Sequence, residues 1–542
     1  MSQTVKASHV ALFISIALVI GLLLGVWLAP SSKGDNEMLD DGPQVNKTNK
    51  MTEIMQLIPK RYVDSISYEQ VEECAIQLLL QYLDPHSVYV PKLDYVEEKE
   101  NLEGEMEGVG LLISMVKDTA FIVEVFKDGP SDRAGILGGD RIITIDGEPV
   151  FGRKFTNKDI VKRLKGPRGT MVNVEISRRG ESKILNFRLK RTTIPLNTVH
   201  YSGMLDDEIG YIYLSEFSAT TYKEMCVALS ALRSQGMQKL ILDLRGNGGG
   251  LLDQAREVAD LFLSKGQLIV YTEGAHSSKK EFYSTAADAF IDGSLVVMMN
   301  EYSASASEVV AGAIQDNDRG LIVGRRSFGK GLVQKQIEMV DGSALRLTTA
   351  RYYTPSGRCI QRPYDKGSDE YYLDFLLRIL ADMESDSIIQ KVTDTTKYYT
   401  KEGRVVYAGG GIFPDKVLPY EKDVLLVYYN RLKNKGAFYK YAFDYVERNR
   451  ALLLNKYPQS DDYVRGFSLS AEMFEDFLMQ AEKLGIKRDV KSIATYGNEM
   501  RILVKAYMAE LLYGGGVRDE IMLAVDHELQ KAINIIKKNK EL

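Results

Sequence analysis

The sequence is poor in cysteine and has no excess of basic charge. Its 542 residues contain three cysteines, at separated positions that match neither a metal-ligand spacing nor a disulfide framework. We therefore expect no metal site and interpret Cys74, Cys226 and Cys359 as small buried apolar residues. The formal net charge is −5, whereas a nucleic-acid-binding protein usually carries a basic excess or a basic stripe. This balance argues against a nucleic-acid partner.

Histidine is also scarce. The five histidines are His9, His86, His200, His276 and His527, and none lies in a sequence setting that indicates a Ser–His catalytic triad. If a serine of this chain acts as a nucleophile, its base is therefore expected to be a residue of another type.

Residues 10–29 form the N-terminal apolar run and contain no charged residue. A helix of this length, at a rise of about 1.5 Å per residue, spans a hydrocarbon layer of about 30 Å. Lys6 precedes the run and several acidic residues follow it, which favours a cytoplasmic N-terminus and an exported body. A cleaved signal peptide is the alternative, but its apolar stretch is normally shorter, and cleavage after Ala29 would place Trp27 where a small residue is preferred. We expect an uncleaved, single-pass anchor in the cytoplasmic (inner) membrane, with the rest of the chain exported to the periplasmic or extracytoplasmic side.

The hydrophobic periodicity changes along the chain, whose length predicts roughly three or four domains. Apolar residues recur at helical spacing before residue 100, and the turn at 83–87 contains His86, which we interpret as a capping or packing residue. Short β-rich runs follow, then alternating strand-like and helix-like segments, which indicate an α/β domain. The predicted boundaries are 1–9 cytoplasmic N-terminus, 10–29 transmembrane anchor or signal peptide, 30–50 linker, 51–103 N-terminal helical module, 104–192 β-rich module, 193–420 α/β domain and 421–542 helical C-terminal region.

Residues 300–308, with the sequence NEYSASASE, follow a predicted strand and open a predicted helix. A hydroxyl at such a turn is exposed, and the helix N-terminus offers unpaired N–H groups to a developing negative charge. An N-cap serine followed by a capping acid is the other interpretation, and this segment alone does not decide between them.

Lys330 lies between two glycines in RRSFGKGLVQ, where a solvated loop lysine is the ordinary interpretation. A lysine replaces histidine as a base only when it is neutral, so burial must lower its pKa, normally about 10.4, by roughly two to three. Gln334, four residues later, is placed to hydrogen-bond the amine and orient it.

The segment LDLRGNGGGL, residues 242–251, runs from a predicted strand through a glycine-rich turn into a helix. The lysine and hydroxyl of a phosphate-binding P-loop are absent, and the glycine spacing fits no dinucleotide fingerprint. Such a turn also presents backbone N–H groups to an oxyanion.

Five motifs, in this order, resemble the carboxy-terminal processing (tail-specific) serine peptidases over roughly residues 50–420. They are DLRGNGGGLL, NEYSASASEVVAGAIQD, GRRSFGKGLVQ, DGSALRLTTARYYTPSGR and GGGIFPD, and LDPHSVYV matches the N-terminal helical module of that family. The resemblance implies a multidomain α/β protein: a crotonase-like α/β peptidase core at 193–420, with an inserted β-rich PDZ domain, an N-terminal helical module and a C-terminal helical tail. It implies a Ser–Lys dyad of Ser305 and Lys330 assisted by Gln334, with the N–H groups of Ala306 and Gly250 as oxyanion donors, and no metal or other cofactor.

The β-rich module at 104–192 resembles a PDZ domain. The loop Gly108, Val109, Gly110, Leu111 and Leu112 stands where these domains bind a peptide carboxylate, and GPSDRAGILGGDRII is a second signature of the module. Free N–H groups in the loop would bind a C-terminal carboxylate while the peptide adds as a strand. An ordinary β-turn without a ligand is the alternative.

The resemblance implies a serine endopeptidase that cleaves exported substrates near their free C-termini. A catalytically inactive PDZ scaffold and an acyl-CoA enzyme with a crotonase-like fold are the alternatives, although the Ser–Lys pair and the PDZ insert favour peptide hydrolysis. The stretches 365–405 and 421–542 match no general motif of the family. The sequence leaves open the physiological substrate and the formation of a homo-oligomer.

Overall fold

The computed structural model describes residues 50–116, 118–152, 155–285, 289–384, 396–421 and 426–538. The chain divides into two compact units, 1–74 and 75–542. The predicted anchor at 10–29 lies outside the described residues. Within the ranges given above, no helix is both long enough and apolar enough to cross a membrane.

The first unit contains α2 (Lys50–Arg61) and the beginning of α3 (Tyr68–Leu83). Cys74 on α3 is exposed, and Cys226 and Cys359 are half-buried. The expectation of three buried cysteines is therefore wrong. On α3 the buried stripe passes through Val71 and Leu80, so an apolar residue at helical spacing is not necessarily on the buried face.

A six-stranded sheet forms the centre of the second unit. All neighbouring strands are parallel except the first pair, in the order β10 (Val199–Met204), β11 (Ile209–Leu214), β12 (Lys239–Asp243), β15 (Ser294–Met299), β16 (Leu321–Gly324) and β21 (Lys416–Val417). Strands of this kind are covered on both faces and are therefore apolar throughout, as SLVVMM in β15 illustrates.

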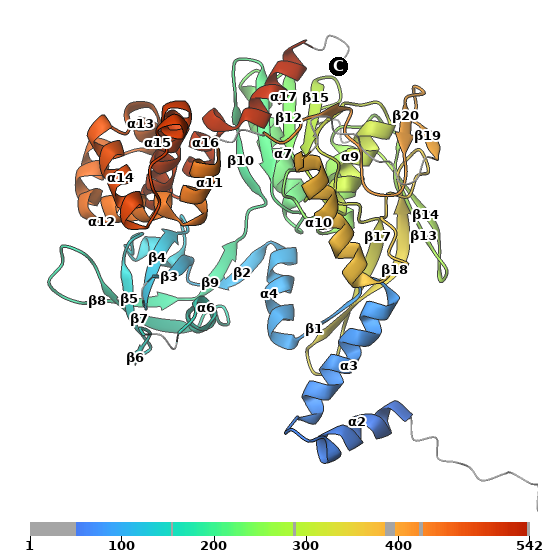
Figure 1. The fold of residues 1–542 in the computed structure, drawn as a ribbon, viewed down its shortest axis with the longest axis horizontal. Coiled ribbons are helices and arrows are strands. Elements are labelled where there is room, and N and C mark those ends of the chain that lie inside the picture. Colours follow the sequence, from blue (N-terminus) through green and yellow to red (C-terminus); the bar gives the residue numbers. More distant parts are fainter. Residues whose placement is uncertain are drawn as a thin grey trace, which may run out of the picture. The chain divides into compact units, whose positions relative to one another are not determined.

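Helices cover both faces of this sheet (Figure 1). One face packs against α7 (Thr221–Ser234), α8 (Leu252–Asp260) and α9 (Ala306–Asp316), and the other against α17 (His527–Lys538). Leu240 and Leu242 of β12 contribute to the first core, whereas Ile241 contributes to the second, because successive residues of a strand face opposite sides. The catalytic motifs predicted from the sequence lie in the loops after β12, β15 and β16, at the carboxyl ends of parallel strands.

A second, antiparallel sheet lies beside these loops. It contains β1 (Val88–Val90), β13 (Leu268–Gly274), β14 (Ser277–Tyr283), β17 (Leu332–Glu338) and β18 (Ala344–Tyr353). β1 pairs with β18, and this pairing brings the turn after α3 to the predicted catalytic residues. The helix α10 (Ser368–Glu384) and the hairpin β19 (Lys397–Tyr399) and β20 (Val405–Tyr407) complete the core.

The β-rich module is inserted between α4 (Lys92–Glu103) and β10, and the paired strands β2 (Glu105–Gly108) and β9 (Thr192–Pro195) mark its entry and exit. Its sheet runs in the order β3 (Leu111–Val116), β4 (Thr119–Val125), β5 (Arg141–Ile145), β7 (Met171–Ser177) and β8 (Leu185–Lys190), with β6 (Glu148–Pro149) on β5. The helices are α5 (Pro130–Arg133) and α6 (Asn157–Leu164), and the module has its own apolar core.

Six further helices form the C-terminal region before α17: α11 (Leu426–Asn434), α12 (Ala437–Lys456), α13 (Ser460–Gly466), α14 (Ala471–Lys483), α15 (Val490–Tyr513) and α16 (Gly515–Met522). They share an aromatic core that includes Phe438, Tyr463 and Phe477. The predicted multidomain α/β architecture, with a β-rich insertion and a helical C-terminal region, is confirmed.

Candidate active site

A cavity of about 500 Å³ brings together the residues that the sequence predicts to be catalytic. Ser305, Ala306, Lys330, Gln334 and Gly250 all line it. They come from three loops and from the beginning of β17. Across the cavity lie residues of α4 and β18, namely Glu98, Asn101, Leu102, Arg346 and Tyr352.

Ser305 occupies a tight turn between β15 and α9. Its backbone has φ of 55° and ψ of −112°, a conformation that is strained for any residue other than glycine. The neighbouring hydroxyls are buried and engaged, because Ser303 Oγ donates to Leu244 O at 2.7 Å and Ser307 Oγ donates to Asn247 O at 2.9 Å. Ser305, in contrast, is half-buried and lines the cavity. Of the three serines in SASAS, only Ser305 is therefore placed to meet a substrate.

The glycine-rich loop lies directly against this turn. A Cβ on Gly249 would lie 2.8 Å from Ser305 Cβ, and one on Gly250 would lie 2.1 Å from Phe217 O, so both positions require glycine. Phe217 bonds to Gly249 O at 2.9 Å and to the Leu251 N–H at 2.8 Å, which leaves the intervening Gly250 N–H pointing away from Phe217. Ala306 is the first residue of α9, so its N–H has no acceptor within the helix. The two predicted oxyanion donors are thus unused by the regular structure around them.

Lys330 is half-buried beside Gln334. Its Nζ donates to Gln334 Oε1 at 3.0 Å. Burial and, to a smaller extent, the positive charge of Arg346 lower the pKa of Lys330 to about 8, against the opposite effect of Glu308 and Asp84. A lysine in this state is available as a base near neutral pH, as the sequence argument required.

The turn after α3 holds Gln334. The Gln334 amide nitrogen donates to the His86 carbonyl oxygen, while Asp84 Oδ1 accepts from the His86 and Ser87 N–H groups, each at 2.8 Å. The His86 ring lies against Phe328 and bonds to Tyr371 OH at 3.0 Å. Burial lowers the pKa of His86 to about 3, so the ring is neutral at pH 7. His86 therefore packs beside the site and positions Gln334 through its backbone.

Glu308 is a site residue that the sequence did not identify beyond its capping position. Its carboxylate is fully buried and accepts from the Ser305 N–H at 2.8 Å, the Lys330 N–H at 2.9 Å and the Gly329 N–H at 2.7 Å, and from Ser327 Oγ at 2.5 Å. Burial raises the pKa of Glu308, whereas these four donors favour its ionised form. One carboxylate thus joins the serine turn to the lysine loop. The sequence gives no signal for this contact, because an acid at the third position of a helix is common.

The predicted carboxylate-binding loop lies at the start of β3, an edge strand of the β-rich module. Met115 N donates to Asn157 Oδ1 of α6 at 2.8 Å, so this N–H points to the free edge beside α6. Alternate N–H groups of a strand share a direction, and those of Leu111 and Ile113 therefore face the same edge. α6 packs beside β3, and its Ile160 and Leu164 are buried in the apolar core of the module.

The comparisons with known proteins agree with this architecture. Peptidase family S41 matches residues 208–366, a PDZ domain matches 121–178, and a family of unknown function (DUF8443) matches 428–514. These matches, with the fold, define a peptidase with an inserted PDZ domain.

Curated relatives extend the likeness beyond the core. The chain is 35% identical over 353 residues to the carboxy-terminal-processing protease of Bartonella bacilliformis, covering 64% of this chain and 80% of the relative. It is 34% identical over 325 residues to the carboxy-terminal processing protease CtpB of Bacillus subtilis, covering 59% of this chain and 67% of the relative. A solved photosystem II D1 C-terminal processing protease is 28% identical over 57% of this chain and 89% of that chain, with a TM-score of 0.33. The chain belongs to the carboxy-terminal processing proteases.

Proposed function

We propose that this peptidase is a serine endopeptidase in which Ser305 is the nucleophile and Lys330 its base, and that it cleaves exported proteins near their C-termini. The observation that carries the proposal is that Ser305, Lys330 and Gln334 line one cavity, in which the lysine is half-buried and its pKa is lowered to about 8. At pH 7 about a tenth of such lysines are neutral, compared with about one in 2,500 at the ordinary pKa of about 10.4.

The mechanism follows from these positions. Neutral Lys330 takes the proton of Ser305 Oγ, and the oxygen forms a bond to the peptide carbonyl carbon. The N–H groups of Ala306 and Gly250 stabilise the oxyanion. Lys330 then gives the proton to the leaving amine as the C–N bond breaks, and afterwards takes a proton from the water that releases the acyl group. Gln334 keeps the amine directed into the cavity.

The proposed role of the PDZ domain is to capture the free C-terminus of the substrate between β3 and α6. A peptide added to β3 uses the N–H groups of Leu111 and Ile113, and the loop at 108–112 receives its carboxylate. The structure supports this proposal by leaving β3 at the edge of its sheet.

We also propose that residues 10–29 remain attached and hold the enzyme in the cytoplasmic membrane with its domains outside. The uncharged run and the charge contrast across it support this placement.

The dyad is tested with Ser305→Ala and Lys330→Ala in a peptide-cleavage assay and in labelling by a fluorophosphonate probe. We expect both variants to lose hydrolysis while keeping the melting temperature of a folded protein, and Ser305→Ala to lose the label. Lys335→Ala is the matched control, because Lys335 is an exposed lysine on the same strand as Gln334. Near-normal turnover by Lys330→Ala at neutral pH would exclude the dyad, and an unlabelled, inactive wild type would favour a peptide-binding scaffold.

A further inference from the structure

The last helix, α17, packs on the back of the catalytic sheet. Leu529, Ala532 and Ile536 are fully buried against the face formed by residues such as Ile241, Val296 and Val323. This helix lies outside the matched ranges 208–366 and 428–514. It is therefore part of the peptidase core in space, although it is distant from the core motifs in sequence.

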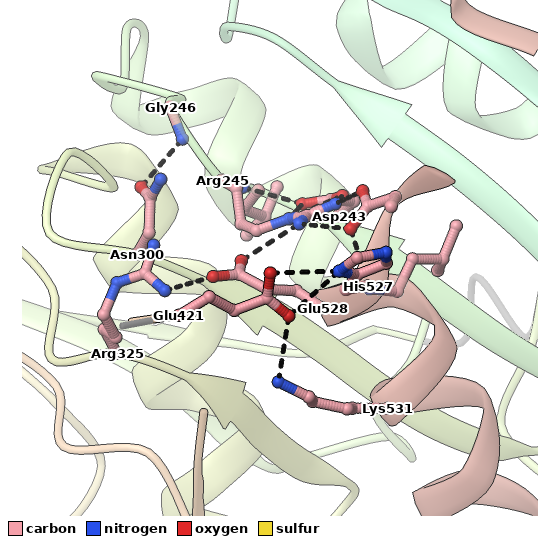
Figure 2. Close-up of polar contacts among 12 residues, drawn as sticks. Asp243, Arg245, Gly246, Asn300, Arg325, Glu421, His527, Glu528 and Lys531 are labelled. Atoms are coloured by element: carbon pink, nitrogen blue, oxygen red, sulfur yellow. Dashed lines mark hydrogen bonds and ion pairs between the residues drawn. The ribbon is translucent and has the colours of Figure 1, made fainter. Parts of the chain in front are cut away.

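Two acidic residues, Asp526 just before α17 and Glu528 in its first turn, bind two arginines of the core. Figure 2 shows Glu528 with Arg245 and Arg325. Asp526 accepts from both terminal nitrogens of Arg245, at 2.5 and 3.1 Å. Glu528 accepts from Arg245 Nη1 at 3.1 Å through one oxygen and from Arg325 Nη1 through the other. Glu528 is thus a bridge between the two guanidinium groups. Each arginine has a further carboxylate partner, Asp243 for Arg245 and Glu301 for Arg325.

The two arginines belong to the two loops that carry the oxyanion glycine and the base. Arg245 follows β12 and lies five residues before Gly250, and Arg325 follows β16 and lies five residues before Lys330. The first loop is also joined to the serine turn, because the Gly246 N–H donates to Asn300 Oδ1 at 2.9 Å. Arg325 is only 8% exposed and Arg245 only 16%, so both charges are held in a poorly hydrated place.

We propose that Asp526 and Glu528 are positioning residues, which set the separation of the oxyanion loop and the lysine loop from behind the sheet. The bidentate contacts fix both position and orientation of a guanidinium group, and a fixed guanidinium fixes the start of its loop. Catalytic groups need to be held within about 0.5 Å of their productive places, and displacements of about 1 Å lower rates by about a hundredfold. The proposal rests on the proposed roles of Gly250 and Lys330.

Apolar residues of α17 pack on the sheet, and Asp526 also caps the helix, because its Oδ1 accepts from the Leu529 N–H at 2.9 Å. Glu528 lies in the first turn and bonds to the two arginines (Figure 2). A neutral, isosteric change at Glu528 therefore removes the bridge while leaving the helix docked. Arg245 keeps Asp243 and Asp526, and Arg325 keeps Glu301, so the change removes only the carboxylate that the two arginines share. Without this shared contact, the two loops are free to move relative to each other.

The test uses the full chain with Glu528→Gln, Asp526→Asn and the double variant. Lys537→Met is the matched control, because it removes an exposed ion pair with Asp206 from the same helix. We expect Glu528→Gln to lower kcat about tenfold to a hundredfold at an unchanged KM, and to slow acylation of each titrated serine by a fluorophosphonate. Lys537→Met is expected to retain the wild-type kcat.

Active-site titration separates positioning from folding. If Glu528→Gln and Asp526→Asn merely contain fewer titratable serines, and each of these serines is acylated at the wild-type rate, the proposal is overturned. The role of α17 is then structural. If Glu528→Gln does not fold, Glu528→Asp takes its place and is expected to lose less kcat, again at unchanged KM; a wild-type kcat there overturns the proposal. Ser305→Ala is assayed in parallel. Turnover by Ser305→Ala refutes the dyad itself. If Ser305→Ala is inactive and Glu528→Gln is fully active, only the positioning proposal is refuted.

Discussion

The protonated form of Lys330 destabilises the folded state, because its half-buried ammonium group is poorly solvated. Its pKa is about 8 in the folded chain, below its ordinary 10.5, so the unfolded state binds more protons between these two values. The free energy of unfolding therefore rises as pH increases from about 8 to about 10.5, and below pH 8 the full penalty remains. We expect Lys330→Met to be inactive and to have a higher melting temperature than the wild type at pH 7, as followed by calorimetry. A lower melting temperature would show that the lysine stabilises the fold.

The same pKa predicts the pH dependence of catalysis. Only the neutral amine takes the serine proton, so kcat/KM is expected to fall about tenfold per pH unit below a midpoint near 8. The profile is measured with a short peptide between pH 5.5 and 9.5, with melting curves at each pH to verify folding. A midpoint near 6.5 would instead indicate a histidine base, although the pKa of the nearby His86 is lowered to about 3.

Glu308 is the residue whose change should affect both catalytic loops at once. Each carboxylate oxygen of Glu308 accepts two hydrogen bonds. In Glu308→Gln an amide NH₂ group replaces one of these oxygens, so in either orientation of the amide two donors lose their acceptor. Leaving such buried donors unsatisfied costs about 1–3 kcal/mol each. We expect a lower melting temperature and at least about a hundredfold loss of kcat, measured by calorimetry and peptide cleavage. Wild-type turnover in this variant would remove Glu308 from the site.

Those site residues that lie within a short sequence motif could be predicted from the sequence. Ser305, Lys330 and Gln334 each lie in a short recognisable segment, and the structure brings them to one cavity. The sequence did not predict that Glu308 contacts the lysine loop, 22 residues away. Nor did it predict that Gln334 contacts the His86 carbonyl, 248 residues away. Such contacts depend on strand order, which local pattern does not contain.

At the scale of elements, the glycine-rich loop and the serine turn are interlocked. Alanine at Gly249 would place its Cβ 2.8 Å from Ser305 Cβ and Ala304 O, at a φ of 104° that disfavours a side chain. We expect Gly249→Ala to lower kcat by more than about a hundredfold, through displacement of the nucleophile. Gly248→Ala is the comparison and should lose far less, since its Cβ would meet no atom within 4 Å. Equal losses in the two variants, measured by peptide cleavage, would argue against a specific clash.

The free edge of β3 in the PDZ domain allows a test of substrate capture. Loop N–H groups distinguish a carboxylate from an amide through charge-assisted hydrogen bonds, worth roughly 1.5–3 kcal/mol. C-terminal amidation of a good substrate should therefore lower its cleavage by about ten- to a hundredfold. Paired peptides that differ only at this terminus provide the comparison. Equal rates for acid and amide would mean that the enzyme selects its substrates elsewhere.

Prediction from sequence was uneven among the elements. The alternation of strands and helices in the core was readable because buried parallel strands are short and apolar, as in β12 and β15. The stretch 365–405 gave no motif, yet α10 within it packs Phe375 against Phe328 of the lysine loop, with ring centroids 4.8 Å apart. The helical pattern after residue 420 did not reveal that α17 covers the core sheet while the preceding helices form their own core. Periodicity shows which residues are apolar, but not which surface they cover.

At the scale of the whole molecule, we propose that the segment 10–29 anchors the chain in the cytoplasmic membrane and that the peptidase and PDZ domains lie outside this membrane. Residues 10–29 are uncharged and long enough to span the membrane, and Lys6 precedes them. We expect the mature protein to retain this segment, to stay in the membrane fraction after washing with high salt and alkaline carbonate, and to be digested by protease added outside intact cells stripped of any outer barrier. A variant with residues 10–29 deleted should lose membrane association and export together. A mature N-terminus near residue 30 would refute the anchor, and protection of the body from external protease, with a cytoplasmic marker equally protected, would refute the orientation.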